Sequence, residues 1–405
     1  MRTNRGPGVV ATIYVGDRLI SAGQILPDGR DAVLVSRGRI EAVGKAAELI
    51  AAAPEASVSR FAGYSITPGL INSHVHLAGD CSTSSFATLC SGAPDEVRAV
   101  IRGNARACLR AGCTTVRDLG DARGYVARFR DATADVDGVR PRILSAGSPL
   151  TISGGHCWYL GGIADTATEI RDAIDRAAET ADLIKIMAGG GYVTSEGPTP
   201  FDAQYSTELL RVAVDHAAHY GLTVAAHAHG TEPIVRCIEA GVHTIEHCGW
   251  RSGPGKRDQN DWAVRQMAQQ GSAAGDTTPA VWREIAKHVT TPDYQYGGQL
   301  TWMAENDVTI LVGTDSGVPG TAFDQLTLSM ELYEELGFTR SSIIDMVTTG
   351  AAQTLGLGDE TGDLRAGLAA DLLIVTGNPL DDLGALHRPH RVVVQGAEYS
   401  QDELD

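Results

Sequence analysis

Residues 9–65 alternate between apolar and polar side chains over short stretches. Turn signals separate these stretches at Pro27-Asp28-Gly29 and Ser36-Arg37-Gly38, where proline and glycine favour tight reversals. Alternation with period two is typical of strands that bury one face. This part of the chain is therefore predicted to form short antiparallel strands.

From about Glu96 onward, apolar runs alternate with longer amphipathic segments. Such segments predict helices, and they include residues 168–181, 206–220, 324–336 and 341–355. Eight strands can be placed between them, beginning near Ile66, Thr114, Arg142, Leu183, Thr223, Thr244, Ser272 and Val308. Repeated strand-helix units are typical of a parallel sheet covered by helices, so we predict an α/β fold, a (β/α)8 TIM barrel.

The pattern of short strands returns after Gly356, at residues 371–375 and 391–395. Both chain ends thus have the same character, which differs from the middle of the chain. We predict that residues 1–65 and 358–405 form a composite β-sandwich domain, and that residues 66–357 form the catalytic barrel.

The most informative segment is TPGLINSHVH at residues 67–76, an apolar run that ends in His74 and His76. Strand side chains repeat with period two, so both imidazoles lie on one face and can bind one metal ion. Two core or surface histidines also occur at this spacing by chance, and the pair alone leaves both interpretations open.

Four further strand-like runs carry a group suited to the same chemistry: Lys185, His227, His247 and Asp315. Singly, Lys185 can be a snorkelling lysine, His247 a core histidine and Asp315 a helix N-cap. The C-terminal ends of parallel barrel strands converge on one face, so all of these groups are predicted to share one pocket.

Motifs along nearly the whole chain carry a family resemblance. They are PGLINSHVH at 68–76, TTVRD at 114–118, GGH at 154–156, IKIMAGG at 184–190, AHAH at 226–229, IEH at 245–247, GTDSG at 313–317 and residues 362–375. These motifs resemble those of the amidohydrolase superfamily, in its imidazolonepropionase-like and prolidase-like (Xaa-Pro dipeptidase type) branch of metal-dependent hydrolases.

The resemblance implies a centre with two divalent ions, which we expect to be zinc. The implied ligands are His74 and His76 for one ion and His227 and His247 for the other. A protonated lysine cannot bind a cation, so Lys185 fits the site only as the N6-carboxylated form, which in the family bridges both metals. Asp315 is implied as a ligand of the first ion and as the base and acid that moves a proton from the nucleophile to the leaving nitrogen.

The implied activity is hydrolysis of a carbon–nitrogen bond, in a dipeptide or N-acyl amino acid, by a metal-bridging hydroxide. A cyclic-amide hydrolase like imidazolonepropionase is the first alternative. A mononuclear deaminase of a ring substrate is the second, because His229-Gly230-Thr231-Glu232 has the His-x-x-Glu spacing that such a site uses. A barrel that acts only as a scaffold or binding partner would leave the ligand set without a role.

Four residues are candidates for substrate contacts. By resemblance, His156 in GGH binds the substrate carbonyl or carboxylate, and we count it among the catalytic residues too. His229 stands where prolidase-like relatives often have a tyrosine that binds a substrate carboxylate. Tyr192, in the stretch of residues 189–201 that is rich in glycine and proline, and Arg283, after the seventh strand, can form a substrate pocket or simply pack within loops.

Composition narrows the range of binding partners and of cellular locations that we expect for this protein. The 405 residues include 33 basic and 50 acidic side chains, and the formal charge of -17 opposes binding to nucleic acid or anionic membranes. Seven cysteines without a C-x-x-C pair favour reduced thiols in the cytoplasm, although Cys157 and Cys248 directly follow site histidines and can be ligands. No apolar run approaches the length of a membrane span. We expect a cytoplasmic homo-oligomer that acts on a small-molecule substrate.

Overall fold

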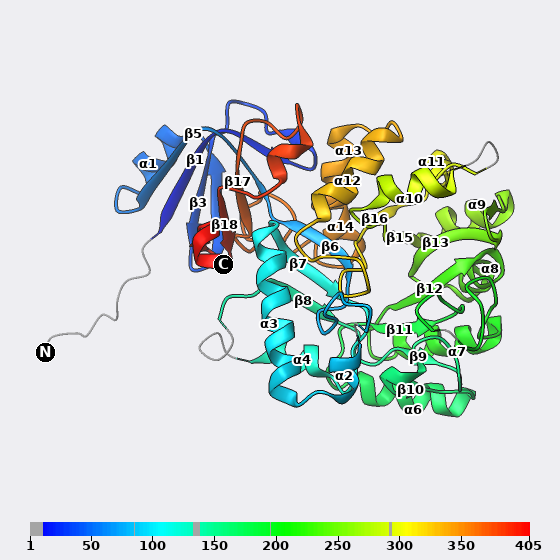
Figure 1. Cartoon of the computed structure of the whole chain (residues 1–405). Helices are drawn as coiled ribbons and strands as arrows, with labels where there is room; N and C mark the ends of the chain where they lie inside the picture. The colour runs from blue at the N-terminus through cyan, green and yellow to red at the C-terminus, as the bar shows by residue number, and fades with distance from the viewer. Residues whose placement is uncertain (1–10, 85, 133–137, 195, 291–293) are drawn as a thin grey trace, which may run out of the picture. The chain divides into compact units, whose positions relative to one another are not determined.

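The structure is a computed structural model that describes residues 11–84, 86–132, 138–194, 196–290 and 294–405 (Figure 1). The chain folds into two compact units. Unit 1 contains the residues up to Ile71, Arg106–Thr115 and Gly337–Asp405, and unit 2 contains Asn72–Ala105 and Val116–Leu336. In the part of the chain that the structure describes, no helix is long and apolar enough to span a membrane.

Unit 1 is built on an eight-stranded sheet in the order β19-β18-β17-β5-β1-β3-β4, with β2 paired to β1. Its strands are β1 (Thr12–Ser21), β2 (Gln24–Ile25), β3 (Ala32–Ser36), β4 (Arg39–Gly44), β5 (Ser57–Pro68), β17 (Leu372–Thr376), β18 (Arg391–Val394) and β19 (Ala397–Tyr399). The helices are α1 (Ala46–Ala52), α13 (Arg340–Met346), α14 (Thr349–Thr354), the 3-10 turn η2 (Leu383–Leu386) and α15 (Gln401–Leu404).

Both chain ends contribute to this sheet. β5 pairs antiparallel with β17, with Ile66 opposite Ile374, and both side chains are fully buried in one apolar cluster. Burial of each such side chain contributes about 1.5–3 kcal/mol, which stabilises the pairing of the two distant segments. The two-layered sandwich and its domain bounds stay predictions.

The remaining strands alternate with helices along the chain and form two further sheets. Most of the residues in these elements belong to unit 2, whereas residues 70–71, 106–110 and 113–115 belong to unit 1. One of the two sheets has the order β10-β9-β11-β12-β13-β15-β16, with β14 added to β13; the other has the order β6-β7-β8. The strands are β6 (Leu70–Val75), β7 (Cys113–Asp118), β8 (Arg142–Ser145), β9 (Leu150–Thr151), β10 (Gly162–Ile163), β11 (Ile184–Met187), β12 (Val224–Gly230), β13 (Thr244–Gly253), β14 (Lys256–Arg257), β15 (Ala273–Asp276) and β16 (Ile310–Val312). From β9 to β16 the described neighbours along the first sheet pair in parallel.

Helices follow most of these strands in the chain, as Figure 1 shows for the cyan to yellow segments. They are α2 (Ala87–Ser91), α3 (Pro94–Arg110), α4 (Tyr125–Asp131), the 3-10 turn η1 (Trp158–Leu160), α6 (Ala167–Ala177), α7 (Thr207–Ala218), α8 (Thr231–Ala240), α9 (Asp261–Gln270), α10 (Trp282–Val289), α11 (Gly298–Glu305) and α12 (Leu326–Glu335). The predicted α/β class with parallel strands is confirmed, whereas closure into a barrel stays a prediction.

Two element predictions need correction. The strand expected near Ile66 begins at Leu70, because Ile66 belongs to β5, which pairs with β17 as far as Pro68. The single helix expected over residues 341–355 is divided into α13 and α14. It breaks at Thr348, whose φ and ψ of -133° and -103° are not helical.

Gly313 positions the end of β16 against the end of β6. A Cβ atom at Gly313 would lie 2.5 Å from His74 Cβ and 2.8 Å from the His74 backbone nitrogen. This close approach lets the backbone N–H groups of Thr314 and Asp315 donate to the His74 carbonyl, at 3.2 and 2.9 Å. The absence of a side chain at Gly313 therefore sets the distance between His74 and Asp315.

We predict that Gly313→Ala destabilises the protein by about 1–3 kcal/mol, because overpacking here forces the two backbones apart. Gly103 in α3 is the matched control: no atom lies within 4 Å of the point that a Cβ would occupy, so Gly103→Ala should stabilise by about 0.5–1 kcal/mol. Urea unfolding of both variants measures the difference. Equal shifts in the two midpoints would contradict the role of Gly313.

Candidate active site

The candidate site is a cavity of about 230 Å³ in unit 2, located where several strands end. Its polar lining residues are His74, His76, His156, Cys157, Lys185, Tyr192, His227, His229, His247, Thr277 and Asp315. A larger cavity of about 320 Å³ also reaches Lys185 but is lined by none of these histidines. The smaller cavity therefore contains the groups with metal-binding chemistry.

One group of possible metal ligands consists of His74, His76 and Asp315, whose ligand atoms lie within 4.8 Å of one another. Asp315 Oδ1 lies 3.4 Å from His74 Nε2 and 3.2 Å from His76 Nε2. This oxygen is buried and accepts no hydrogen bond of normal geometry from the described residues. The other ring nitrogens are engaged, because Nδ1 donates to Glu246 in His74 and to the Gly120 carbonyl in His76, at 2.9 and 3.0 Å. The Nε2 atoms of His74 and His76 therefore carry the lone pairs that can bind a cation.

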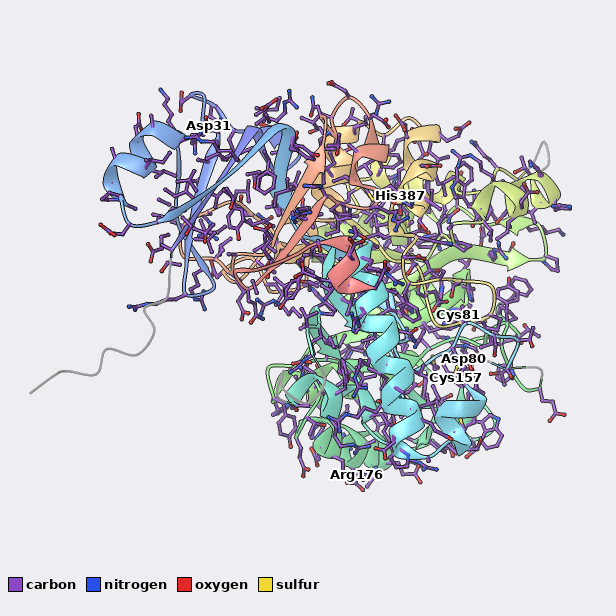
Figure 2. All side chains as sticks on the ribbon, turned by 60° about the vertical axis from the view of Figure 1, so that its left-hand side comes forward. Asp31, Asp80, Cys81, Cys157, Arg176 and His387 are labelled. Atoms are coloured by element: carbon purple, nitrogen blue, oxygen red, sulfur yellow. The ribbon has the colours of Figure 1, made fainter. Side chains whose placement is uncertain are left out.

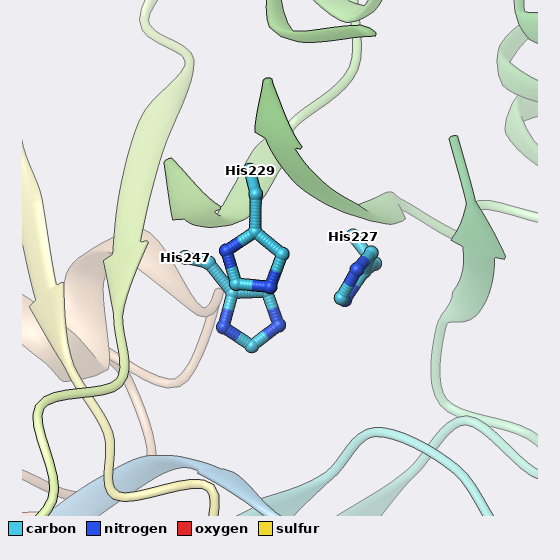
Figure 3. Close-up of side chains that lie close together, drawn as sticks. All are labelled: His227, His229 and His247. Carbon is cyan, nitrogen blue, oxygen red and sulfur yellow. The ribbon is translucent and has the colours of Figure 1, made fainter. Parts of the chain in front are cut away.

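The second group consists of His227, His229 and His247, which Figure 3 shows with the ring of His229 over that of His247 and His227 beside them. The ligand atoms again lie within 4.8 Å of one another. His227 Nε2 donates to the Gly190 carbonyl at 3.0 Å, and His247 Nδ1 lies 2.7 Å from Thr277 Oγ1. These contacts leave the opposite nitrogen of each ring for a cation. His229 was expected among the substrate contacts, and the structure adds it to this group.

Lys185 lies in β11 and lines the same cavity as both groups. It is only 1% exposed, and burial lowers the pKa of its amine to about 8 against the opposing effects of Glu246 and Asp315. No ion pair or hydrogen bond of its amine is found among the described residues. A buried amine without such partners is costly in its charged form, so burial favours the neutral amine.

Burial keeps most of the site histidines neutral. It lowers the pKa of His74 and His156 to about 4 and that of His229 to about 3, and it lowers the pKa of His227 and His247 well below the usual value. His76 differs: burial again lowers its pKa, but the close contact and charge of Asp315, the charge of Asp118 and the hydrogen bond to the Gly120 carbonyl together raise its pKa above the usual value. Neutral imidazole is the form that binds metals, so these neutral histidines can bind a cation without first losing a proton.

The roles of Glu246 and Arg117 were not predicted from the sequence. Glu246 Oε2 accepts from His74, while Oε1 accepts from Arg117 at 2.8 Å and from Thr244 Oγ1 at 2.6 Å. Arg117 also donates to the Ser73 carbonyl at 2.7 Å. A charged side chain inside an apolar strand was the available signal, since burial requires such charges to be paired.

Of the remaining predicted contacts, His156 and Tyr192 line the cavity and Arg283 does not. The ring centres of His156 and His227 lie 4.5 Å apart. Cys157, which is labelled in Figure 2, has its Sγ atom 3.5 Å from His156 Nε2. Arg283 lies in α10, where it is paired with Glu331 and stacked on Trp282. These contacts hold its side chain outside the cavity, which corrects the expectation from its place after the seventh strand.

Glu232, which the deaminase alternative requires, lies in the first turn of α8. Its side chain is 61% exposed and forms an ion pair with Arg236 at 2.5 Å. It does not line the cavity that contains the histidines. The structure therefore separates this carboxylate from the candidate site.

Arg251 is a further residue that was not predicted from the sequence. It lines a pocket of about 130 Å³ that shares Tyr192, His229, His247 and Thr277 with the main cavity. The residue lies in the same strand as His247, four positions later. Its place near the C-terminal end of β13 was the signal that could have identified it.

Comparison with known proteins agrees with this geometry. The Amidohydrolase family matches residues 65–398, and the bacterial imidazolonepropionase-like composite domain matches residues 32–56. Ochratoxinase of Aspergillus niger is 29% identical, over 97% of this chain and 88% of its own. Imidazolonepropionase of Cupriavidus pinatubonensis is 26% identical, over 89% and 88%.

A solved prolidase structure, in complex with N-methylphosphonate-L-proline, superposes with a TM-score of 0.80 at 25% identity. The alignment covers 96% of this chain and 100% of the prolidase. The family match covers most of the chain and includes every residue of the two ligand groups. This chain therefore belongs to the amidohydrolase family and is a hydrolase acting on carbon–nitrogen bonds.

Proposed function

We propose that this protein cleaves the amide bond of a dipeptide or an N-acyl amino acid with the help of two divalent metal ions. The observation that carries the proposal is the pair of ligand groups around one cavity, with the buried Lys185 lining it as well. Two such groups offer more ligands than a single tetrahedral site needs. The similarity to a prolidase and an ochratoxinase supports an amide substrate.

The donor set fits two metal ions, most often zinc for imidazole and carboxylate ligands. His74, His76 and Asp315 would hold one ion, and His227 and His247, with His229 close by, would hold the other. When bound, such ions lower the pKa of water to about 7 and polarise the carbonyl of the substrate.

Lys185 would complete the centre as a carbamate. An ammonium group in this position would repel the cations that the histidines attract. Addition of carbon dioxide to the neutral amine forms the N–C bond and releases a proton, which converts the side chain into an anion with two ligand oxygens. The burial of Lys185 and the lack of an ion pair to its amine among the described residues support this assignment.

Asp315 and His156 would handle the substrate. Burial raises the pKa of Asp315, but the neighbouring His74 and His76 outweigh this effect, so the pKa lies below its usual value and the group is a carboxylate at neutral pH. Its Oδ1, which accepts no hydrogen bond of normal geometry from the described residues, can accept a proton from the attacking water and return it to the leaving nitrogen. His156 is neutral and can donate a hydrogen bond to a carbonyl oxygen without a net charge.

Hydrolysis of a cyclic amide is the second candidate. The match of residues 32–56 to an imidazolonepropionase-like domain and the similarity to imidazolonepropionase favour it. The chemistry at the carbonyl is the same for both candidates, so they differ in the shape of the substrate. The exposed position of Glu232 argues against ring deamination.

We expect metal-loaded protein to release a carboxylic acid and an amine from N-acyl amino acids, dipeptides or lactams, and to release no ammonia from aminopurines or aminopyrimidines. Product analysis by liquid chromatography and a coupled ammonia assay measure the two outcomes. Ammonia release that Glu232→Gln abolishes and Lys185→Ala leaves intact would overturn the amidase proposal.

Elemental analysis should find about two divalent ions per chain, because each ligand group suits one ion. Lys185→Ala should lose metal and activity, since the histidines would then lack a bridging anion, and added short carboxylic acids should partly restore both. Lys287→Ala is the matched control, as Lys287 is exposed and paired with Glu284. Full metal content in Lys185→Ala would contradict the carbamate.

Asp315→Asn should lower kcat by at least roughly a hundredfold, because an amide can neither accept nor deliver the proton. The fold should persist, since asparagine tolerates the left-handed backbone at this position, where φ is 53°. Asp307→Asn changes an exposed aspartate with φ of 60° in the same way and should leave turnover unchanged. Turnover by Asp315→Asn near that of the control would assign the proton transfer to another group.

A further inference from the structure

The pocket next to the metal-binding groups contains a partly buried arginine in an unusual setting. Arg251 Nη1 donates to the Tyr192 hydroxyl at 2.6 Å, and Nη2 donates to the Tyr294 hydroxyl at 2.8 Å. No ion pair joins Arg251 to a carboxylate among the residues that the structure describes. The guanidinium is thus oriented by two neutral groups and keeps its charge uncompensated.

The carboxylate within this pocket does not serve as the missing partner. Asp276 lines the pocket, but its Oδ2 accepts from the Tyr333 hydroxyl at 2.8 Å and from the Thr278 backbone at 3.3 Å. Tyr333 is itself buried and holds the carboxylate toward the protein interior. An anion that compensates Arg251 would therefore come from a ligand.

The pocket of Arg251 adjoins the cavity in which the scissile amide bond would lie. This pocket and the metal cavity share Tyr192, His229, His247 and Thr277, so the two spaces adjoin along these side chains. The rings of Tyr192 and His229 lie 5.0 Å apart. In an N-acyl amino acid, one carbon separates the amide nitrogen from the carboxylate. A substrate with its amide at the histidines would thus place a carboxylate close to this pocket.

We propose that Arg251, oriented by Tyr192 and Tyr294, binds the free α-carboxylate of the substrate, which restricts the enzyme to substrates with a carboxylate next to the scissile amide. This inference rests on the proposed amide hydrolysis. Arginine presents two parallel N–H groups that match the two oxygens of a carboxylate, and such charge-assisted pairs are stronger than neutral hydrogen bonds. The hydrogen bonds to the two tyrosine hydroxyls already order the Arg251 side chain in the free enzyme. Binding of a carboxylate therefore costs less side-chain entropy.

A purely structural role is the competing explanation. Arg251 connects the segments that carry Tyr192 and Tyr294, and its guanidinium lies 5.9 and 5.7 Å from their ring centres. Arg257 lies 4.7 Å from the ring centre of Tyr294 and would still support that residue without Arg251. If Arg251 has only a structural role, its removal should lower the turnover of all substrates alike. If it binds the carboxylate, its removal should lower the turnover of only those substrates that carry a carboxylate.

The test compares metal-loaded wild type and Arg251→Met on N-acetyl-L-phenylalanine and N-acetyl-L-phenylalaninamide, and on the leucine and proline pairs, with acetate release as the readout. Wild type should prefer the acids by roughly 10–100-fold in kcat/KM, the range for hydrogen bonds to a charged group. Arg251→Met should lose this preference while it retains turnover of the amides. Tyr294→Phe should lose part of the preference, because one orienting hydroxyl is removed.

Arg283→Met is the matched control, since Arg283 is exposed and paired with Glu331, and it should keep the full preference for acids. Equal losses on acids and amides in Arg251→Met, or no preference in wild type, would overturn the proposal and leave amide hydrolysis standing. Calorimetric binding of the same compounds separates the two proposals. Tighter binding of the acids that depends on Arg251, without cleavage, would support this site and reject the hydrolysis; no binding and no cleavage would reject both.

Discussion

The candidate site depends on one buried ion pair, between Arg117 of β7 and Glu246 of β13. The side chains of Arg117 and Glu246 are 2% and 0% exposed. Burial of a charge without a paired and hydrogen-bonded partner costs several kcal/mol, so loss of either residue would destabilise the protein by about that amount. Glu246 meets this requirement by accepting from His74 as well, which fixes the His74 ring and its tautomer. Gly275 leaves room for the carboxylate, because a Cβ there would lie 2.2 Å from Glu246 Oε2. The pair thus joins strands of two sheets and orients a proposed metal ligand.

The charge balance explains why an additional anion would be needed if the site holds two metal ions. With most of its imidazoles neutral, the charges of Arg117 and Glu246 cancel, as do those of Lys185 and Asp315 in their usual forms. Two divalent ions would leave a large positive excess in a low-dielectric interior. The proposed carboxylation of Lys185 would reverse the sign of its charge and reduce that excess. The same balance explains why a neutral His156 suits the substrate carbonyl, since a further positive charge would weaken metal binding.

The sequence predicted the residues at strand ends better than their partners. His74, His76, Lys185, His227, His247 and Asp315 all line one cavity, because strand periodicity and parallel topology suffice to bring them together. The role of Glu246 depends on Arg117, which is distant in sequence, and no local pattern relates the two. Arg251 lies near the end of β13 and Arg283 follows β15 in the chain, but Arg283 forms an ion pair with Glu331. Only the packing of side chains on neighbouring elements distinguishes these two arginines.

The backbone of β13 shows how one strand serves three roles. Glu246 accepts a hydrogen bond from His74, His247 lines the cavity of the candidate site, and Arg251 lines the adjoining pocket. A regular strand would send the consecutive residues Glu246 and His247 to opposite faces. Here His247, Cys248 and Trp250 have positive φ values of 66°, 42° and 49°, and the register with β12 shifts between Ala228 and Gly230. Such conformations cost about 1–3 kcal/mol each and persist where the surrounding structure enforces them, often at functional sites. The irregular end of β13 therefore gives up local stability to bring the ion pair, the histidine cluster and the proposed carboxylate site onto one segment.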